Sequence, residues 1–209
     1  MTIHNLVILI GPAASGKTTL AEYMELNGFN KIVTSTTRTK RVGEVDGVQY
    51  HFATIAEFQS WVRAGKLIEY NQYCGNYYGV NGETFLTEIY SATANGKSSV
   101  LITDIHGVSK VKTWLWENNI TNVKCFTAFC YVPPSVQKER LIERISSEIS
   151  NLNGAPLDRS HLNTFFDRAH TSMVEYTWMQ NPLVDILVCC DTPESNHQNL
   201  QKLNDLLGR

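Results

Sequence analysis

Residues 11–18, GPAASGKT, follow the pattern G-x-x-x-x-G-K-[ST], which is typical of loops that bind phosphate groups. Gly11 and Gly16 permit backbone angles that other residues avoid, so consecutive N–H groups can converge on phosphate oxygens. Lys17 is expected between the β- and γ-phosphates of a nucleoside triphosphate, and the hydroxyl of Thr18 is the expected ligand of its Mg²⁺ ion. The pattern therefore predicts a triphosphate site. It does not predict which base the nucleotide carries, because the loop contacts only phosphates.

The segments around this loop have the character that phosphate binding requires. The apolar run LVILI (6–10) has the length of a buried strand, and a helical pattern follows from about Lys17 to Asn27. A helix that begins at the loop turns its positive end toward a bound anion. The alternative is a glycine-rich turn that binds nothing, and the presence of both Lys17 and Thr18 directly after a strand argues against it.

A second polar segment, TSTTRTKRVGEVD (34–46), has the residue types of another anion site. Arg38 and Arg41 are three residues apart, and each guanidinium is a planar fork that can bind two phosphate oxygens. Tyr50 and Tyr78 offer neutral hydroxyl donors. On its own such a basic run is as consistent with a solvated loop, and it is the preceding phosphate loop that favours a second phosphate site.

Three further charged residues are candidates for the chemistry. Asp104 ends an apolar strand, where a carboxylate is costly unless it is paired or near a metal, although a satisfied structural aspartate is the alternative. Arg140 and Arg144 lie one helical turn apart, where like charges cost about 0.2–0.5 kcal/mol in an isolated helix. An anion between the two arginines relieves that cost, and pairing with Glu143 and Glu148 within the helix is the alternative.

Apolar runs of strand length alternate with helical patterns over most of the chain. This alternation predicts an α/β fold, in which a parallel sheet is covered by helices on both faces. Beyond 6–10, buried strands are expected at 99–104, 124–132 and 185–190, and helices near 107–118, after Pro133-Pro134 with Ser135 as the N-cap, and at 194–207.

Two segments interrupt this alternation. Residues 34–96 are rich in aromatic and polar residues, hold short strand-like pieces such as VQYHFAT, and are expected to form an inserted subdomain with two helices. Residues 145–164 are polar, with Gly154 and Pro156 at the middle, and are expected to form a mobile helical hairpin or lid. In the insertion, Thr54 and Glu57 predict a capping box before a helix whose apolar face holds Ile55, Phe58, Trp61 and Val62.

The composition is that of an ordinary globular protein, since 43% of the 209 residues are apolar and 18% are charged. A net charge of −2 gives no global field for nucleic acid or an anionic membrane. The five cysteines include no Cys-x-x-Cys pair, which favours buried thiols in a reducing compartment over a disulfide framework, and the histidines show no zinc spacing. The short apolar run near the N-terminus has no basic region before it, so we expect a soluble cytoplasmic protein.

Five blocks of the chain resemble the guanylate kinase family, in the family's order and at similar spacing. They are GPAASGKTT, TSTTRTKRVGEVDGVQYHF, LIEYNQYCGNYYGV, VLITDIHGVSKVK and YVPPSVQKERLIER, and they span nearly the whole chain. The family consists of nucleoside monophosphate kinases, which move the γ-phosphoryl group of ATP to GMP. The resemblance implies a P-loop NTPase-type parallel sheet flanked by helices, with a core at 1–33, 97–144 and 165–209, a nucleotide-monophosphate-binding subdomain at 34–96 and a helical lid at 145–164.

The resemblance also implies roles for particular residues. The arginine and tyrosine side chains of the second anion site would hold the α-phosphate of GMP, and Thr34 and Glu69 would read its base. Guanine presents adjacent N1–H and N2–H donors that suit a carboxylate, although Glu69 taken alone is more typical of an exposed carboxylate at a helix end. The expected ATP contacts are Gly11, Pro12, Ala13, Ala14, Ser15, Gly16, Lys17, Thr18 and Thr19, and the expected GMP contacts are Thr34, Ser35, Arg38, Arg41, Tyr50, Glu69, Tyr78, Val80 and Asp104.

Catalysis is expected to consist of positioning and charge neutralisation, because phosphoryl transfer needs no covalent protein intermediate. By resemblance, Lys17, Mg²⁺ and the lid arginines would stabilise the transferring group, and lid closure would exclude water. Asp104 is expected near the Mg²⁺ region, where it can reach the ion through a water molecule. The lid arginines are Arg140, Arg144 and Arg168.

The chain departs from the family pattern at four places. Val80 follows GNYYG where the family usually carries Ser or Thr to help read guanine, and a missing buried hydrogen bond costs about 1–3 kcal/mol unless it is replaced. Ile102 stands where an acidic residue is frequent, and Cys190 stands where an asparagine is common near the donor base. The lid segment is longer than usual and lacks the usual glycine after Arg144.

These departures leave two other functions open. One is a kinase of another nucleoside monophosphate or of a sugar phosphate on the same scaffold. The other is a non-catalytic guanylate kinase-like binding module, which the intact Lys17 and Thr18 disfavour. The expected partners are the small-molecule nucleotides ATP and GMP or dGMP, with no nucleic acid and no membrane, and the chain is expected to be a monomer or a homodimer.

Overall fold

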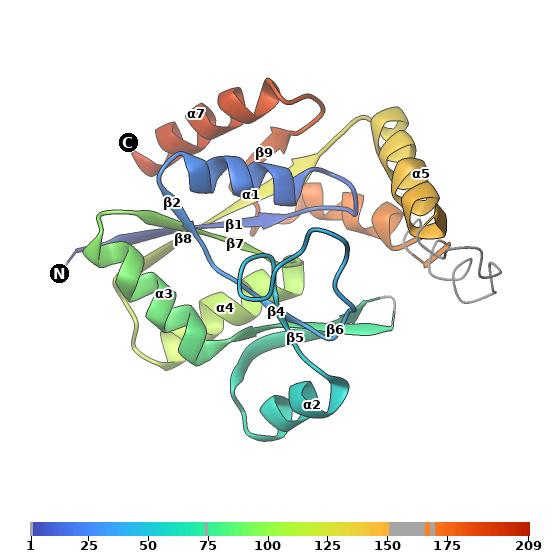
Figure 1. The fold of residues 1–209 in the computed structure, drawn as a ribbon. Coiled ribbons are helices and arrows are strands. Elements are labelled where there is room, and N and C mark those ends of the chain that lie inside the picture. Colours follow the sequence, from blue (N-terminus) through green and yellow to red (C-terminus); the bar gives the residue numbers. More distant parts are fainter. Residues whose placement is uncertain (1, 74, 151–165, 168–169) are drawn as a thin grey trace. The chain divides into compact units, whose positions relative to one another are not determined.

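The computed structural model, drawn in Figure 1, describes residues 2–73, 75–150, 166–167 and 170–209. The chain divides into two compact units. Unit 1 comprises Met1–Leu9 and Ala21–Thr127, and unit 2 comprises Ile10–Leu20 and Ala128–Arg209. These boundaries differ from the predicted division into core, nucleotide-monophosphate-binding subdomain and lid, which therefore stays a prediction. Most of the predicted lid, 151–164, lies outside the described residues.

A five-stranded, mostly parallel sheet in the order β2-β7-β1-β8-β9 is the main framework, and it confirms the predicted α/β class. The side chains of Leu6–Ile10 are wholly buried, which explains why this strand is a continuous apolar run with no polar face. All four predicted strands are present with ends shifted by one or two residues, and the short β2 was not predicted. The strands are β1 (His4–Ile10), β2 (Phe29–Lys31), β7 (Ser98–Ile102), β8 (Val123–Tyr131) and β9 (Ile186–Cys189).

Helices flank this sheet on both sides. In Figure 1, α1 (Lys17–Leu26) lies on one side of β1, and α3 (Gly82–Ala94) and α4 (Ile105–Glu117) lie together on the other. The last two helices contact each other through the rings of Phe85 and Trp114, whose centroids are 6.0 Å apart. Helices α3 and α4 therefore build one layer of unit 1.

A second sheet, in the order β4-β3-β6-β5, fills the segment that the sequence marks as an insertion. Its longest strands, β5 and β6, form an antiparallel hairpin that the sequence reasoning missed, because its tyrosine-rich segments show no clean alternation of apolar and polar residues. The predicted piece VQYHFAT contributes only a two-residue strand. The strands are β3 (Ser35–Thr36), β4 (His51–Phe52), β5 (Leu67–Tyr73) and β6 (Asn76–Asn81).

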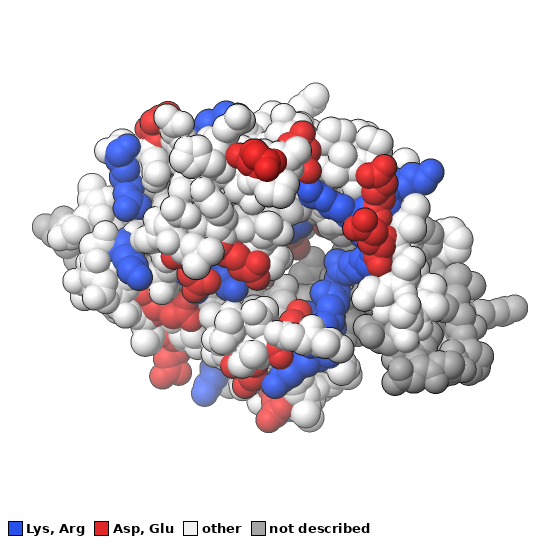
Figure 2. Space-filling view, turned by 45° about the horizontal axis from the view of Figure 1, so that its top comes forward, with Lys and Arg blue, Asp and Glu red and all other residues white. Residues whose placement is uncertain are grey.

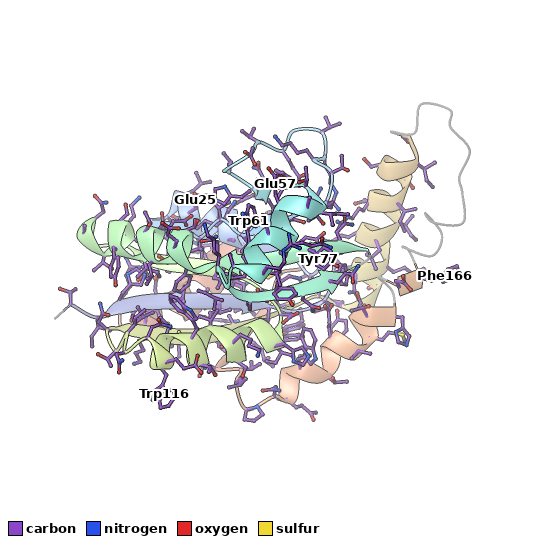
Figure 3. The ribbon with its side chains drawn as sticks, turned by 90° about the horizontal axis from the view of Figure 1, so that it is seen from below. Glu25, Glu57, Trp61, Tyr77, Trp116 and Phe166 are labelled. Atoms are coloured by element: carbon purple, nitrogen blue, oxygen red, sulfur yellow. The ribbon has the colours of Figure 1, made fainter. Side chains whose placement is uncertain are left out.

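Helix α2 (Ile55–Arg63) begins at the predicted capping box. The amide of Thr54 donates to the Glu57 carboxylate at 2.7 Å, and the amide of Glu57 donates to the Thr54 hydroxyl at 3.2 Å. Of the four residues predicted to share one face of this helix, Phe58 is fully buried and Ile55 is 53% exposed. The buried ring of Phe58 contacts those of Trp61, Tyr70 and Tyr77. Figure 3 labels Trp61, on α2, and Tyr77, on β6.

Unit 2 contains helices α5 (Pro134–Ser150) and α7 (Ser195–Leu207) and a 3-10 helix, η1 (Tyr176–Gln180). The expectation that Ser135 is an N-cap is wrong, because the carbonyl of Pro133 already accepts from the amide of Gln137 at 3.0 Å. Pro134 therefore occupies the first helical position, where its fixed φ suits the helix and its missing N–H costs nothing.

The surface carries no dominant sign of charge on the face drawn in Figure 2, where basic and acidic side chains are interspersed. Among the described residues, no helix is both long enough and apolar enough to cross a membrane.

Candidate functional site

The loop between β1 and α1, in unit 2, has the backbone that its glycines predict. Gly11 has φ of +136° and Gly16 has φ of +88°. A Cβ on Gly11 would lie 2.2 Å from the carbonyl oxygen of Cys130, and one on Gly16 would lie 2.7 Å from the Cβ of Cys190. Both positions therefore require glycine for two reasons, the backbone angle and the close approach of a neighbouring strand end.

Lys17 turns its ammonium group back over this loop. Its Nζ donates to the carbonyl oxygens of Gly11 at 2.7 Å and Pro12 at 2.8 Å. Burial lowers the pKa of Lys17, and the Glu175 carboxylate is the largest influence in the opposite direction. The cation is thus held at the loop, while the side chains of Thr18 and Thr19 are exposed at the first turn of α1.

Helix α5 braces the phosphate loop from the side. The side-chain amide of Gln137 donates to the carbonyl of Ala13 at 2.8 Å. Arg140 donates from Nη2 to the carbonyl of Asp191 at 2.8 Å and from Nη1 to that of Ala14 at 3.5 Å. Arg140, expected to clamp the transferring phosphoryl group, therefore contacts the main chain of the loop.

Of the other two expected lid arginines, the structure describes only Arg144. Arg144 is half-buried on α5, one turn beyond Arg140. Arg168 lies outside the described residues. The role of all three as a phosphoryl clamp remains a prediction.

Arg38, in unit 1, is paired with a carboxylate that the sequence analysis did not single out. Its Nη2 and Nη1 donate to Glu44 at 2.7 and 2.9 Å, and the main-chain amide of Arg41 donates to the same carboxylate at 2.7 Å. Burial lowers the pKa of Arg38, but the Glu44 carboxylate raises it more, and the net shift is upward. The acidic residue inside the basic run was the available signal for this pair.

Aromatic rings surround the Arg38 guanidinium. Its Cζ lies 5.4 Å from the ring centre of Tyr50 and 5.7 Å from that of Phe52, within the range of cation–π attraction. The rings of Tyr50 and Tyr78 are 6.1 Å apart. The structure thus brings three of the four predicted phosphate-binding side chains together around Arg38, with the backbone of Arg41 linked to them through Glu44.

A cavity of about 270 Å³ lies between β5 and the start of α4, within unit 1. Its lining includes the predicted Glu69 and Asp104 and the unpredicted Asn71, His106 and Lys110. Glu69 is therefore a strand residue facing a cavity, and the alternative of an exposed carboxylate at a helix end is wrong.

The two carboxylates of this cavity are held by neutral partners. The hydroxyl of Thr103 donates to Oε1 of Glu69 at 2.9 Å. Asp104 is the N-cap of α4, where its Oδ1 accepts from the amide of Gly107 at 2.8 Å, and its Oδ2 accepts from Asn71 at 2.8 Å. Burial raises the pKa of Glu69 to about 7, an effect that the Thr103 bond reduces and the charge of Asp104 reinforces.

Three other predicted contacts lie close to this cavity or to β3. Thr34 is half-buried just before β3, and its carbonyl accepts from the amide of His51 at 2.9 Å. Ser35 and Val80 are 3% and 1% exposed, so the protein itself covers both side chains. Val80 lies directly opposite Glu69 in the β5–β6 ladder.

Oxygen ligands for a metal are available at the loop, where the exposed hydroxyl of Thr18 is of the kind that Mg²⁺ prefers. Within the part of the chain that the structure describes, no group of three or more His, Cys, Asp or Glu side chains could hold a metal ion. Asp104 is engaged by the helix N-terminus and by Asn71, which is the satisfied structural role that the sequence left open.

A profile of the guanylate kinase family matches residues 3–151 of the chain. Among curated relatives, a guanylate kinase from Chlorobium luteolum is 35% identical over 84% of this chain and 85% of its own length. A guanylate kinase from Enterococcus faecalis is 39% identical over 51% of this chain, and this chain spans about half, 52%, of that relative.

Comparison of structures points to the same fold. A crystal structure of a guanylate kinase from Anaplasma phagocytophilum superposes with a TM-score of 0.54, covering 99% of this chain and 84% of that one. The identity is 19%, so this likeness concerns the fold alone.

Proposed function

Because the chain belongs to the guanylate kinase family, we propose that it transfers the γ-phosphoryl group of ATP to GMP or dGMP. An α-phosphate oxygen of the acceptor attacks the γ-phosphorus, the bond to the β,γ-bridging oxygen breaks, and ADP and GDP or dGDP are released. The observation that carries the proposal is the phosphate loop, whose two glycines are required by its packing and whose Lys17 is held at the loop carbonyls.

The donor triphosphate binds at this loop. Its phosphate oxygens accept hydrogen bonds from main-chain N–H groups of residues 13–19, and Lys17 leaves the carbonyls of Gly11 and Pro12 to contact the outer phosphates. The Thr18 hydroxyl would hold a Mg²⁺ ion, which when bound supplies charge neutralisation between the β- and γ-phosphates. Gln137 and Arg140 keep the loop in shape through the carbonyls of Ala13 and Ala14.

The acceptor phosphate binds at Arg38, Arg41, Tyr50 and Tyr78. Arg38 has five N–H donors, and Glu44 takes two of them, so the carboxylate fixes the plane of the guanidinium. The two tyrosines add neutral donors without adding charge. Arg140, Arg144 and Arg168 neutralise the transferring group and help to exclude water, which would otherwise be an acceptor.

The base of the acceptor occupies the cavity at Glu69. An ionised Glu69 accepts N1–H and N2–H of guanine together, which adenine does not offer. Thr34 is the second residue assigned to reading the base, and Asp104 lines the cavity while it caps α4. We propose a cytoplasmic monomer or homodimer that acts on free nucleotides and binds neither nucleic acid nor membrane.

A panel of acceptors tests the function directly. GMP, dGMP, AMP, UMP and CMP are each supplied with ATP and Mg²⁺, and ADP is followed in a coupled assay. We expect ADP formation with GMP and dGMP that collapses in Lys17→Met, whereas Lys138→Met, an exposed position on α5, remains active. Equal rates in Lys17→Met and the unaltered chain would refute phosphoryl transfer at this loop.

Val80 and Ile102 depart from the family pattern, and for this reason the panel also tests a second candidate function, the phosphorylation of another small phosphate-bearing acceptor. Activity with AMP, UMP or CMP above that with GMP would favour it. A failure to bind ATP–Mg²⁺ in calorimetry would favour a non-catalytic module.

A further inference from the structure

Thr103 supplies a hydroxyl to the carboxylate that faces Val80 in the β5–β6 ladder. Val80 faces Glu69 across the β5–β6 ladder and has no hydrogen-bonding side chain. Thr103, which follows β7, donates its hydroxyl hydrogen to Oε1 of Glu69 at 2.9 Å. No other described residue donates a hydrogen bond to that carboxylate.

On the basis of the proposed function, we infer that Thr103 is a specificity-determining residue of the acceptor site, whose hydroxyl orients Glu69 and accepts a hydrogen bond from the N2 amino group of guanine. This role is distinct from that of Glu69 itself. It assigns to the residue that follows β7 a contact that Val80, on β6, cannot make.

The first turn of α4 fixes the Thr103 side chain in place. A Cβ on Gly107 would lie 2.0 Å from the Thr103 hydroxyl oxygen and 3.0 Å from its Cβ. The same glycine donates its amide to Asp104 at 2.8 Å, so the turn that accommodates Thr103 is itself capped. Thr103 therefore presents its hydroxyl to Glu69 from a position that is closely packed against the first turn of α4.

The hydrogen-bonding capacity of a hydroxyl matches this role. It has one hydrogen, which Glu69 receives, and two lone pairs that remain to accept. Guanine carries two hydrogens on N2, of which one accompanies N1–H toward the carboxylate. The second can be donated to Thr103, so the pair Glu69 and Thr103 together reads the amino group that distinguishes guanine from hypoxanthine.

The surroundings of Glu69 favour its protonated form, and the Thr103 hydrogen bond favours the ionised form. The titratable groups that line the cavity with it are Tyr70 on β5 and Asp104, His106 and Lys110 from the start of α4. In the β5–β6 ladder, the apolar Val80 lies at the facing position. Burial and Asp104 both raise the pKa of Glu69, and the Thr103 bond lowers it. Loss of the hydroxyl therefore favours the protonated carboxyl, which accepts fewer hydrogen bonds from the base.

The test compares two variants with two nucleotides. Thr103→Val keeps the branched shape without the hydroxyl, and Thr103→Ser keeps the hydroxyl. GMP is compared with IMP, which lacks the N2 amino group, by kcat/KM in the coupled assay. We expect Thr103→Val to lower kcat/KM for GMP about tenfold, the size of one buried hydrogen bond, and for IMP by a much smaller factor. The Thr103→Ser variant is expected to stay within about threefold of the unaltered chain with both nucleotides.

A pH profile adds a reading that a purely structural role would not change. In Thr103→Val, the acidic limb of kcat/KM for GMP should move to higher pH, while KM for ATP stays constant. Equal losses with GMP and IMP, an unmoved acidic limb, or a Thr103→Ser variant as impaired as Thr103→Val would each overturn the inference while leaving the kinase function intact. If the unaltered chain phosphorylates neither nucleotide, the proposed function fails, and the inference falls with it.

Discussion

The ionisation of Glu69 should control the pH dependence of acceptor use. Burial raises its pKa from 4.5 to about 7, so the carboxyl titrates within the working range of the assay. The carboxylate accepts both guanine N–H groups, whereas the protonated acid has lost one acceptor. We therefore expect kcat/KM for GMP to rise with pH through a midpoint near this value.

The size of the rise follows from the ionised fraction. With a pKa of about 7, roughly one-tenth of Glu69 is ionised at one pH unit below the midpoint and about nine-tenths at one unit above. This predicts an increase in kcat/KM for GMP of about eight- to tenfold over those two units. KM for ATP should not follow this titration, because the phosphate loop belongs to unit 2 and does not include the carboxyl.

The control is Glu69→Gln, because the phosphate of GMP itself titrates near pH 6. Glutamine does not titrate, so the limb that remains in the variant belongs to the nucleotide or to other groups. At high pH, the variant should lose about ten- to hundredfold in kcat/KM for GMP, since hydrogen bonds to a charged group are worth about 1.5–3 kcal/mol. An undiminished rise in the variant, or a loss of less than twofold at high pH, would refute this account of base recognition.

Two further predictions concern the loop and the stability of unit 1. Gly16→Ala places a Cβ 2.7 Å from that of Cys190 at a φ of +88°, so we expect ATP affinity to fall more than tenfold in calorimetry, with Gly96→Ala, at positive φ but without a close neighbour, as the matched control. Equal affinities for Gly16→Ala and Gly96→Ala would contradict it. Burial raises the pKa of Glu88 on α3 to about 7, so its contribution to stability is full below the unfolded value of 4.5 and is lost as pH rises through 7. The melting temperature of the unaltered chain should therefore fall relative to that of Glu88→Gln between pH 5 and pH 8. A constant difference between the two melting temperatures would show that the carboxyl does not titrate as described.

Some features of the fold could be predicted because local chemistry decides them. The strand at 6–10 and the capping box at Thr54 both depend on residues close in sequence, and both are confirmed. The β5–β6 hairpin could not be predicted, because its residues are arranged by contacts with other elements. Glu69, for example, faces Val80 in the ladder and Thr103 after β7, and neither neighbour is visible from the sequence around it.

The features of the candidate site also divide into those that the local sequence predicts and those that it does not. The glycines of the phosphate loop were predictable because their backbone angles are a local requirement. The partners of Arg140 were not, because they are main-chain carbonyls 126 and 51 residues away. Every residue has a main-chain carbonyl, so the residue type does not reveal which carbonyl an arginine contacts. The sequence analysis therefore considered the glutamates of the same helix as partners of Arg140.

The departures from the family pattern are better understood together with the residues that face them. Cys190 approaches Gly16 so closely that its Cβ lies 2.7 Å from where a Cβ on that glycine would be, so this position is adjacent to the phosphate loop itself. Val80 removes a hydroxyl on β6, and Thr103 supplies one after β7 to the same carboxylate. Under the proposed function, the loss of a hydroxyl on one strand would be compensated by a hydroxyl from another element, and selectivity for guanine would depend on the cavity as a whole rather than on any single strand.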